Sequence, residues 1–128
     1  MTKFPLLAIL LFIGISGFSQ TQTEQEIKAL LCHKWKVTHM EVGGQKVAVP
    51  AEFSELYLDI KSNGTLIEIE PEGEHKGTWS YQHKTKTFIT DDEDGIKKHE
   101  IVKINETEFI MKSDLKGLLM SLIMKRVN

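Results

Sequence analysis

From residue 35 onward, apolar and polar side chains alternate with a period of two in one short segment after another. Successive side chains of a β-strand point to opposite faces, so this alternation predicts half-buried strands. Eight segments show the pattern, at residues 35–42, 56–61, 65–70, 77–81, 87–91, 97–104, 108–113 and 118–127. Turn-forming residues, such as the Asn63-Gly64 pair, separate them and predict tight hairpins.

Most of these segments follow one another after short turns, and no helical segment long enough for a crossover lies between them. Parallel strands need such crossovers, so the sheet is predicted to be antiparallel. An open sheet of eight strands would leave two unpaired edges, and closure removes both. The expected fold is therefore all-β, an eight-stranded antiparallel up-and-down barrel. Its interior is either filled by side chains or able to hold one small ligand.

A helical pattern precedes the first strand. Thr23 and Glu26 have the spacing of a capping box, and Ile27, Leu30 and Leu31 follow as an apolar stripe. A helix of about two to three turns is not stable by itself. We therefore expect the helix at residues 24–32 to rest on the barrel and to close one of its ends.

Residues 1–19 have the layout of a secretory signal peptide, with Lys3 before an apolar run at residues 4–18. A membrane-spanning helix needs about 20 apolar residues, so we interpret the segment as a signal rather than an anchor. Gln20 stands where a lipid-modified protein would have cysteine. The prediction is a barrel domain at residues 20–128 that is secreted or periplasmic and has no membrane partner after signal cleavage.

The charge and the cysteine content narrow the range of partners. The chain has 16 Lys and Arg against 18 Asp and Glu, a weak acidic balance that does not indicate a nucleic-acid partner. The single cysteine, Cys32, excludes an internal disulfide. We interpret Cys32 as a small half-buried apolar residue and expect a monomer; the alternative is an exposed thiol that joins two copies.

Three stretches of the sequence resemble a known group of small barrels. In LLCHKWKV (30–37) a helix leads into a tryptophan strand, as in the Gly-x-Trp motif of lipocalins, with His33 in place of the glycine. LYLDIKSNGTLIEI (56–69) and GTWSY (77–81) form a hairpin followed by an aromatic strand. IMKRV (123–127) ends the chain with the arginine that many lipocalins place against their first tryptophan.

Over residues 30–127 the chain thus resembles the lipocalin-like families of small exported bacterial proteins, within the calycin group. The resemblance implies a small cavity for an apolar ligand inside the barrel. It also implies a structural role for Trp35 and Arg126, because an arginine stacked on a tryptophan face would join the first strand to the last.

Alternation assigns one set of side chains to the barrel interior. These are Trp35, Val37, His39, Leu56, Leu58, Ile60, Ile67, Ile69, Trp79, Tyr81, Phe88, Phe109, Met111, Met120, Leu122 and Met124. From the residues, a packed core and a ligand cavity are both open, and the resemblance favours the cavity. The predicted ligand-binding residues are Val37, His39, Leu58, Ile69, Trp79, Tyr81, Phe88, Phe109, Met111 and Met120. His39 and Tyr81 would orient a polar group of the ligand.

Gly77 opens the strand that carries Trp79 and Tyr81. A glycine within a strand weakens the strand, so its presence indicates that a side chain would not fit or that the backbone bends. We therefore expect either a sharp bend there or the close approach of another segment.

Neither an enzyme nor a cofactor is predicted. The five histidines are scattered and lack the spacing of a metal site. The acidic run at residues 91–95 fails the calcium-loop pattern, because Thr90 and Ile101 fall at its first and twelfth positions. We find no phosphate-binding glycine loop and no nucleophile elbow.

Residues 43–54 are predicted to form a loop, with Gly43, Gly44 and Pro50 as breakers. An alternative function uses this loop, which contains Val47, Val49 and Phe53. In that case the barrel is filled, and the loop binds another protein, as in a protease inhibitor or an envelope stress factor.

Overall fold

The computed structural model describes residues 22–51, 55–115 and 117–127. In these residues one helix, α1 (Glu24–Leu31), precedes nine strands: β1 (Lys34–Val42), β2 (Gln45–Ala48), β3 (Tyr57–Ile60), β4 (Thr65–Glu70), β5 (Gly73–Gln82), β6 (Thr87–Asp92), β7 (Gly95–Ile104), β8 (Glu108–Leu115) and β9 (Leu118–Arg126). The predicted signal peptide and Phe53 lie outside the described residues. Within the described part, no helix is long and apolar enough to cross a membrane.

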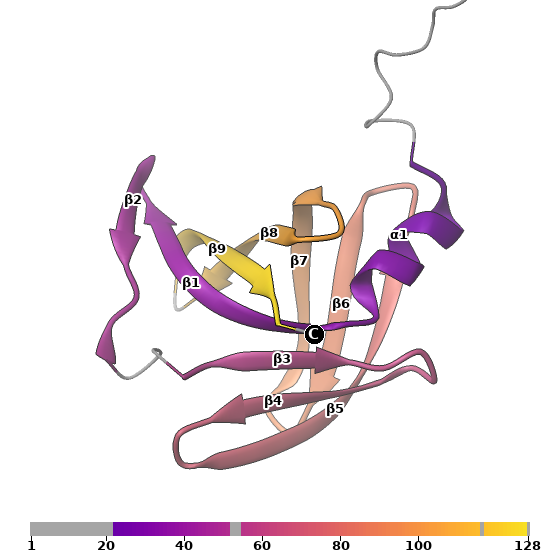
Figure 1. The fold of residues 1–128 in the computed structure, drawn as a ribbon, viewed down its shortest axis with the longest axis horizontal. Helices are drawn as coiled ribbons and strands as arrows, with labels where there is room; N and C mark the ends of the chain where they lie inside the picture. Colours follow the sequence, from indigo (N-terminus) through magenta and orange to yellow (C-terminus); the bar gives the residue numbers. More distant parts are fainter. Residues whose placement is uncertain (1–21, 52–54, 116, 128) are drawn as a thin grey trace, which may run out of the picture.

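The strands form a closed antiparallel barrel (Figure 1). From β3 to β9 each strand pairs with the next along the chain, and β1 pairs with β3 on one edge and with β9 on the other. Eight strands therefore close the barrel, as the alternation predicted, and the first and last strands meet without leaving an edge between them.

The short strand β2 corrects the prediction of a loop at residues 43–54. It pairs with the second half of β1, from His39 to Val42, while β3 pairs with the first half of the same edge. All four residues of β2 are exposed, whereas Val49, just after it, packs against the core. β2 is thus an addition to the barrel.

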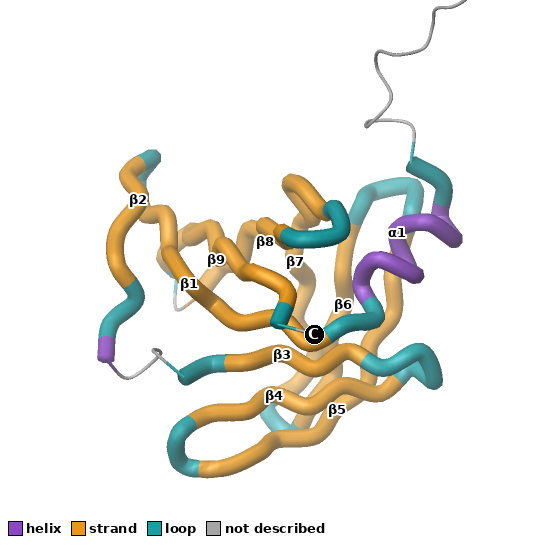
Figure 2. Tube along the Cα trace, viewed as in Figure 1, coloured by secondary structure: helices purple, strands orange, loops and turns teal. Residues whose placement is uncertain are grey.

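The turns gather at the two ends of the barrel (Figure 2). Helix α1 lies at the end that holds the β3–β4, β5–β6 and β7–β8 turns; we name this the capped end and the opposite one the far end. Both bonds of the predicted capping box between Thr23 and Glu26 are present, at 2.8 and 3.1 Å. Ile27 and Leu31 are buried in the core, which confirms that the helix rests on the barrel.

Aromatic rings fill the half of the lumen next to the helix. Trp35, Phe88 and Phe109 are fully buried, and the Phe109 ring centroid lies 5.5 Å from that of Trp35 and 5.9 Å from that of Phe88. The Trp35 indole N–H donates to the Leu31 carbonyl at 3.1 Å, so helix and barrel share one core. Burial of each such side chain contributes about 1.5–3 kcal/mol.

A bulge in β1 reverses the predicted orientation of His39. Val37 pairs with Met124, but the next pair joins His39 to Ile123, so Thr38 is an extra residue on β1. The Thr38 hydroxyl donates to the Ile123 carbonyl at 3.2 Å and supports this geometry. His39 is consequently exposed on the outer face, and the prediction that it points inward was wrong; Met40, 5 % exposed, takes the inward position.

The register of the β3–β4 hairpin overturns a second inward assignment. Residues directly opposite each other in an antiparallel pair share a face. Leu58, in the core, lies opposite Glu68, whereas Ile69 lies opposite Tyr57 on the outer face. Ile67 and Ile69 therefore point outward, and Glu68 points into the lumen, although the apolar pattern of β4 predicts the reverse.

Gly77 is required by a close approach between strands. A Cβ atom at this position would lie 2.6 Å from the Asp91 carbonyl oxygen and 3.1 Å from the Asp92 Cβ. The second of the two predicted reasons for this glycine is thus confirmed. Trp79, on the same face, packs against the core, with its ring centroid 6.0 Å from that of Phe88.

We predict that Gly77→Ala lowers the free energy of unfolding by about 1–3 kcal/mol, because the new methyl group would have to push β6 away from β5. Urea unfolding followed by tryptophan fluorescence would measure the change. Ser80→Ala, at an exposed position of the same strand, is the control. Equal stability of the two variants would contradict the prediction.

Candidate functional site

The far half of the lumen has two chemically different walls. Strand register places Thr90 opposite Trp79, His99 opposite Phe88 and Ser113 opposite Met120, so these polar residues share the inward face. We name as the polar wall six inward polar residues of β4, β6, β7 and β8: Glu68, Thr90, Asp92, Lys97, His99 and Ser113. We name as the apolar wall the inward residues in the far halves of β1 and β9: Met40, Val42, Met120 and Leu122.

A buried histidine lies at the centre of the polar wall. His99 is 7 % exposed, and its ring nitrogens contact two hydroxyl groups: Nδ1 lies 2.7 Å from Ser113 Oγ, and Nε2 lies 3.3 Å from Thr90 Oγ1. Burial lowers the pKa of His99 to about 4, and the charge of Lys97 acts in the same direction. The imidazole is therefore neutral near neutral pH.

Two carboxyl groups of the polar wall, Glu68 and Asp92, share a hydrogen bond. Burial, together with the hydrogen bond to Asp92, raises the pKa of Glu68 to about 7. The charge of Lys97 acts in the opposite direction and is outweighed. Burial also pushes the pKa of Asp92 upward, but the Glu68 hydrogen bond, the Asp94 N–H at 2.8 Å and Lys97 outweigh it, so this pKa is lowered. Near neutrality the pair holds a proton on Glu68 for part of the time.

An acidic rim surrounds this side of the far end. His75 lies between two carboxylates, with Nε2 3.3 Å from Glu70 and Nδ1 3.1 Å from Glu93. The Glu93 hydrogen bond raises the pKa of His75 above its ordinary value. The rim thus adds negative charge to the approach to the polar wall.

The predicted ligand-binding residues divide among three places. Most of them are buried in the filled half of the lumen, namely Val37, Leu58, Tyr81, Phe88, Phe109 and Met111. Trp79 and Met120 are half-buried and point inward, the second within the apolar wall. His39 and Ile69 lie on the outer face, and their inward assignment is corrected above.

The polar wall was missed because the inward face of each strand was assigned mainly from its apolar residues. The signal was present in the alternation: Thr90 and Asp92 continue the inward parity of Phe88, and Ser113 continues that of Met111. Counting parity through the polar positions would have found these three residues. Glu68 could not have been found in this way, because its inward position depends on the hairpin register.

The predicted pair of Trp35 and Arg126 lies where the barrel closes. The two residues are directly opposite each other in the β1–β9 ladder. The Arg126 guanidinium donates from Nη1 to the Glu106 carbonyl at 3.4 Å. The position fits the predicted structural role, and stacking of the guanidinium on the indole stays a prediction.

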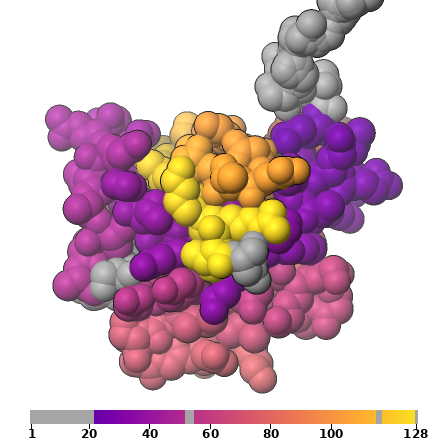
Figure 3. Space-filling model, viewed as in Figure 1, coloured from indigo at the N-terminus to yellow at the C-terminus, as the bar shows by residue number. Residues whose placement is uncertain are grey.

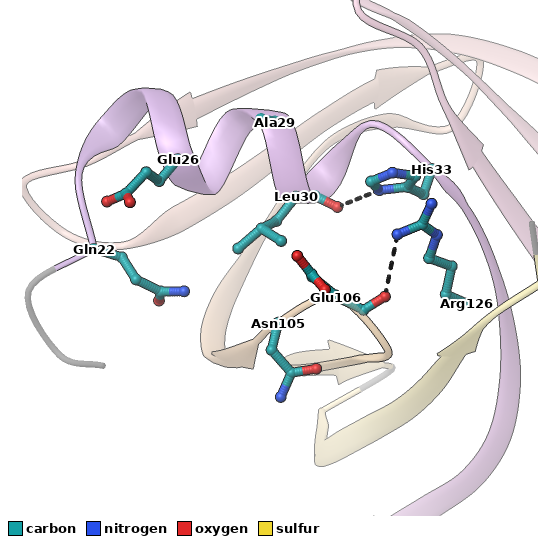
Figure 4. A pocket seen from close by; sticks show the side chains of 8 residues that line it. All are labelled: Gln22, Glu26, Ala29, Leu30, His33, Asn105, Glu106 and Arg126. Carbon is teal, nitrogen blue, oxygen red and sulfur yellow. Dashed lines mark hydrogen bonds between the residues drawn. The ribbon is translucent and has the colours of Figure 1, made fainter. Parts of the chain in front are cut away.

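Hollows on the outside of the protein cluster around the capped end. One of about 610 Å³ lies between α1, the β7–β8 turn and the end of β9, which meet on one face of the molecule (Figure 3). Most of its lining residues have polar side chains, with Gln22, Glu26, Asn105, Glu106 and Arg126 around Leu30 (Figure 4). The His33 Nδ1 in its wall is bonded to the Leu30 carbonyl at 2.9 Å. This hollow lies outside the lumen in which the ligand cavity was predicted.

Among the described residues, no three or more His, Cys, Asp or Glu side chains are grouped so that they could hold a metal ion. Cys32 is half-buried, as predicted, and burial raises the pKa of its thiol.

Comparisons with known proteins support the fold. The chain matches no protein-family model, and no curated protein matches it by sequence. Among solved structures, it is similar to a lipocalin-like protein from Bacteroides uniformis, with a TM-score of 0.54 over 76 % of this chain and 98 % of that one. The two sequences are 12 % identical, so the likeness concerns the fold. The protein is thus an antiparallel barrel similar in fold to a lipocalin-like protein.

We predict that His99 makes the protein less stable in acid. The unfolded chain takes up a proton near pH 6.5, and the folded chain does so only near pH 4. The free energy of unfolding is therefore highest above the first value and falls as the pH drops toward the second, by roughly 2–3 kcal/mol. Urea unfolding of the wild type and of His99→Gln across this range would isolate the difference. The exposed His39→Gln is the control, and parallel pH profiles for wild type and His99→Gln would refute the prediction.

Glu68 is predicted to act in the opposite direction. Its folded pKa is raised from 4.5 to about 7, so its contribution to stability is complete below the first value and is lost as the pH rises through the second. Glu68→Gln stays neutral and should exceed the wild type in stability above about pH 7 by roughly 1–2 kcal/mol, allowing for solvent screening. Chemical unfolding at increasing pH measures this gain, with the exposed Glu74→Gln as control. A gain that does not change with pH would rule out the proposed cause.

Proposed function

We propose that the barrel binds a small molecule in the far half of its lumen. The apolar body of the ligand lies against Met120 and Leu122, and a polar group faces His99 and its hydroxyl partners. The observation that carries the proposal is the meeting of these two walls, one half-buried and apolar and the other polar and mostly buried. Ligand sites combine an apolar lining with a few placed polar groups in this way.

The difference between the two halves of the lumen supports this location. Near the helix, Trp35, Phe88 and Phe109 are fully buried and pack against one another. In the far half, Val42, Met120 and Leu122 point inward and yet remain partly exposed. Water therefore reaches these side chains, and a ligand that enters from the far end would cover them.

The polar wall is also difficult to explain as a device for stability. Burial of a polar group costs free energy unless hydrogen bonds compensate it, and apolar residues of similar volume often stabilise a protein as well or better. Six neighbouring inward positions are nevertheless polar or charged. A strongly raised pKa such as that of Glu68, beside a specific charged partner, is more frequent at functional sites than elsewhere.

The sequence also bears on where the protein acts and on the alternative function. We propose that residues 1–19 direct export and that the barrel works outside the cytoplasm as a monomer. Binding of another protein through residues 43–54 has weaker support, because Val49 packs inward and Val47, 41 % exposed, is the one exposed large apolar residue among those described there.

A lumen-blocking substitution tests the proposal. We expect the neutral dye N-phenylnaphthylamine to gain fluorescence with the wild type, and Met120→Trp to weaken this binding roughly tenfold or more, because the indole would occupy the far half. Leu119→Trp is the matched control, since Leu119 is the next residue and is 63 % exposed. Urea unfolding would verify that both variants are folded. Failure of the wild type to bind the dye, or equal binding by Met120→Trp, would overturn the proposal.

A further inference from the structure

The Thr90–His99–Ser113 group has more hydrogen-bond donors than it uses in its two contacts. Neutral His99 has one N–H and one nitrogen lone pair, and Thr90 and Ser113 have one O–H each. Three donor hydrogens therefore serve two contacts, at 2.7 and 3.3 Å. If Nδ1 carries the proton, it donates to Ser113, and the Ser113 O–H is left over. If Nε2 carries it, the Thr90 O–H is left over.

The remaining hydroxyl hydrogen is buried and faces the lumen. Ser113 is 2 % exposed and Thr90 7 % exposed, and both lie on the inward face of their strands. Within the described residues, neither hydroxyl has another hydrogen-bond partner beyond His99. A buried donor without an acceptor has lost its hydrogen bond to water and gained none in return, which costs free energy. An oxygen acceptor that enters the lumen would remove this cost.

The charges around the hydroxyls indicate which kind of acceptor fits. The charge of Lys97 lowers the pKa of both Glu68 and Asp92, so the Asp92 carboxylate offsets part of this charge. A carboxylate ligand would meet the negative charge of Asp92 and of the rim carboxylates Glu70 and Glu93. An uncharged oxygen meets no such repulsion.

We propose, on the basis of the ligand-binding function above, that the polar group of the ligand is an uncharged carbonyl or hydroxyl oxygen that accepts the spare hydrogen of the Thr90–His99–Ser113 group. The barrel then selects ketones and alcohols with an apolar chain over the carboxylate of the same chain length. The selection depends on Asp92, which keeps Lys97 from attracting an anion.

Displacement of N-phenylnaphthylamine by three matched compounds tests this inference. At about pH 8, where a fatty acid is fully ionised, we expect methyl nonyl ketone and decanol to displace the dye at concentrations roughly tenfold or more below that of decanoate. Equal or stronger displacement by decanoate overturns the selectivity and leaves the proposed function intact. Loss of dye binding itself overturns the proposed function, so the two failures are distinct.

Two variants assign the selectivity to its residues. Asp92→Asn removes the carboxylate that offsets Lys97, and it is expected to raise the affinity for decanoate relative to that for the ketone roughly tenfold. The exposed outward neighbour Asp91→Asn is its control. The double variant Thr90→Val with Ser113→Ala should weaken the ketone roughly tenfold while the dye still binds. Unchanged selectivity in Asp92→Asn, or unchanged ketone affinity in the double variant, would contradict the proposed roles.

Discussion

The pairing of β1 with β9 is the interaction on which the rest of the structure depends. It closes eight strands into a ring, so no strand of the ring keeps an unpaired edge along this seam. Closure also gives every strand an inner and an outer face, and it creates a lumen with two ends. Helix α1 covers one end through Ile27 and Leu31, which are buried in the same core as Trp35. The remaining end is the place where a ligand can be proposed.

The lumen combines two solutions to the problem of filling a small barrel. Next to the helix, aromatic rings pack against one another and exclude solvent, which stabilises the fold. Toward the far end, the inner face changes from rings to hydroxyls, an imidazole and carboxyl groups. His99 and Glu68 then have opposite effects on stability as the pH changes, because burial disfavours the charged form of each. The filled half provides the rigidity that a precisely placed polar group in the other half requires.

Much of the fold could be predicted from the sequence, whereas only part of the candidate site could. The strand positions, the capping box at Thr23 and the inward positions of Trp35, Phe88 and Phe109 follow from local patterns that the structure preserves. His39 was misplaced because a single bulge residue reverses every later side chain of β1. Ile69 was misplaced because outward apolar residues on β4 produce the same alternation as inward ones. Polar inward residues such as His99 were overlooked because apolar character was used as the sign of burial.

The sequence by itself determined the class of fold, since period-two alternation and tight turns are local properties that permit little besides an antiparallel meander. It also determined the helix and its cap, which depend on residues within two turns of one another. The tertiary structure decided which face of β4 is inside and where β1 changes phase, because both depend on pairing with distant strands. It alone brought Thr90, His99 and Ser113 together, from three strands whose register is set by the closed barrel.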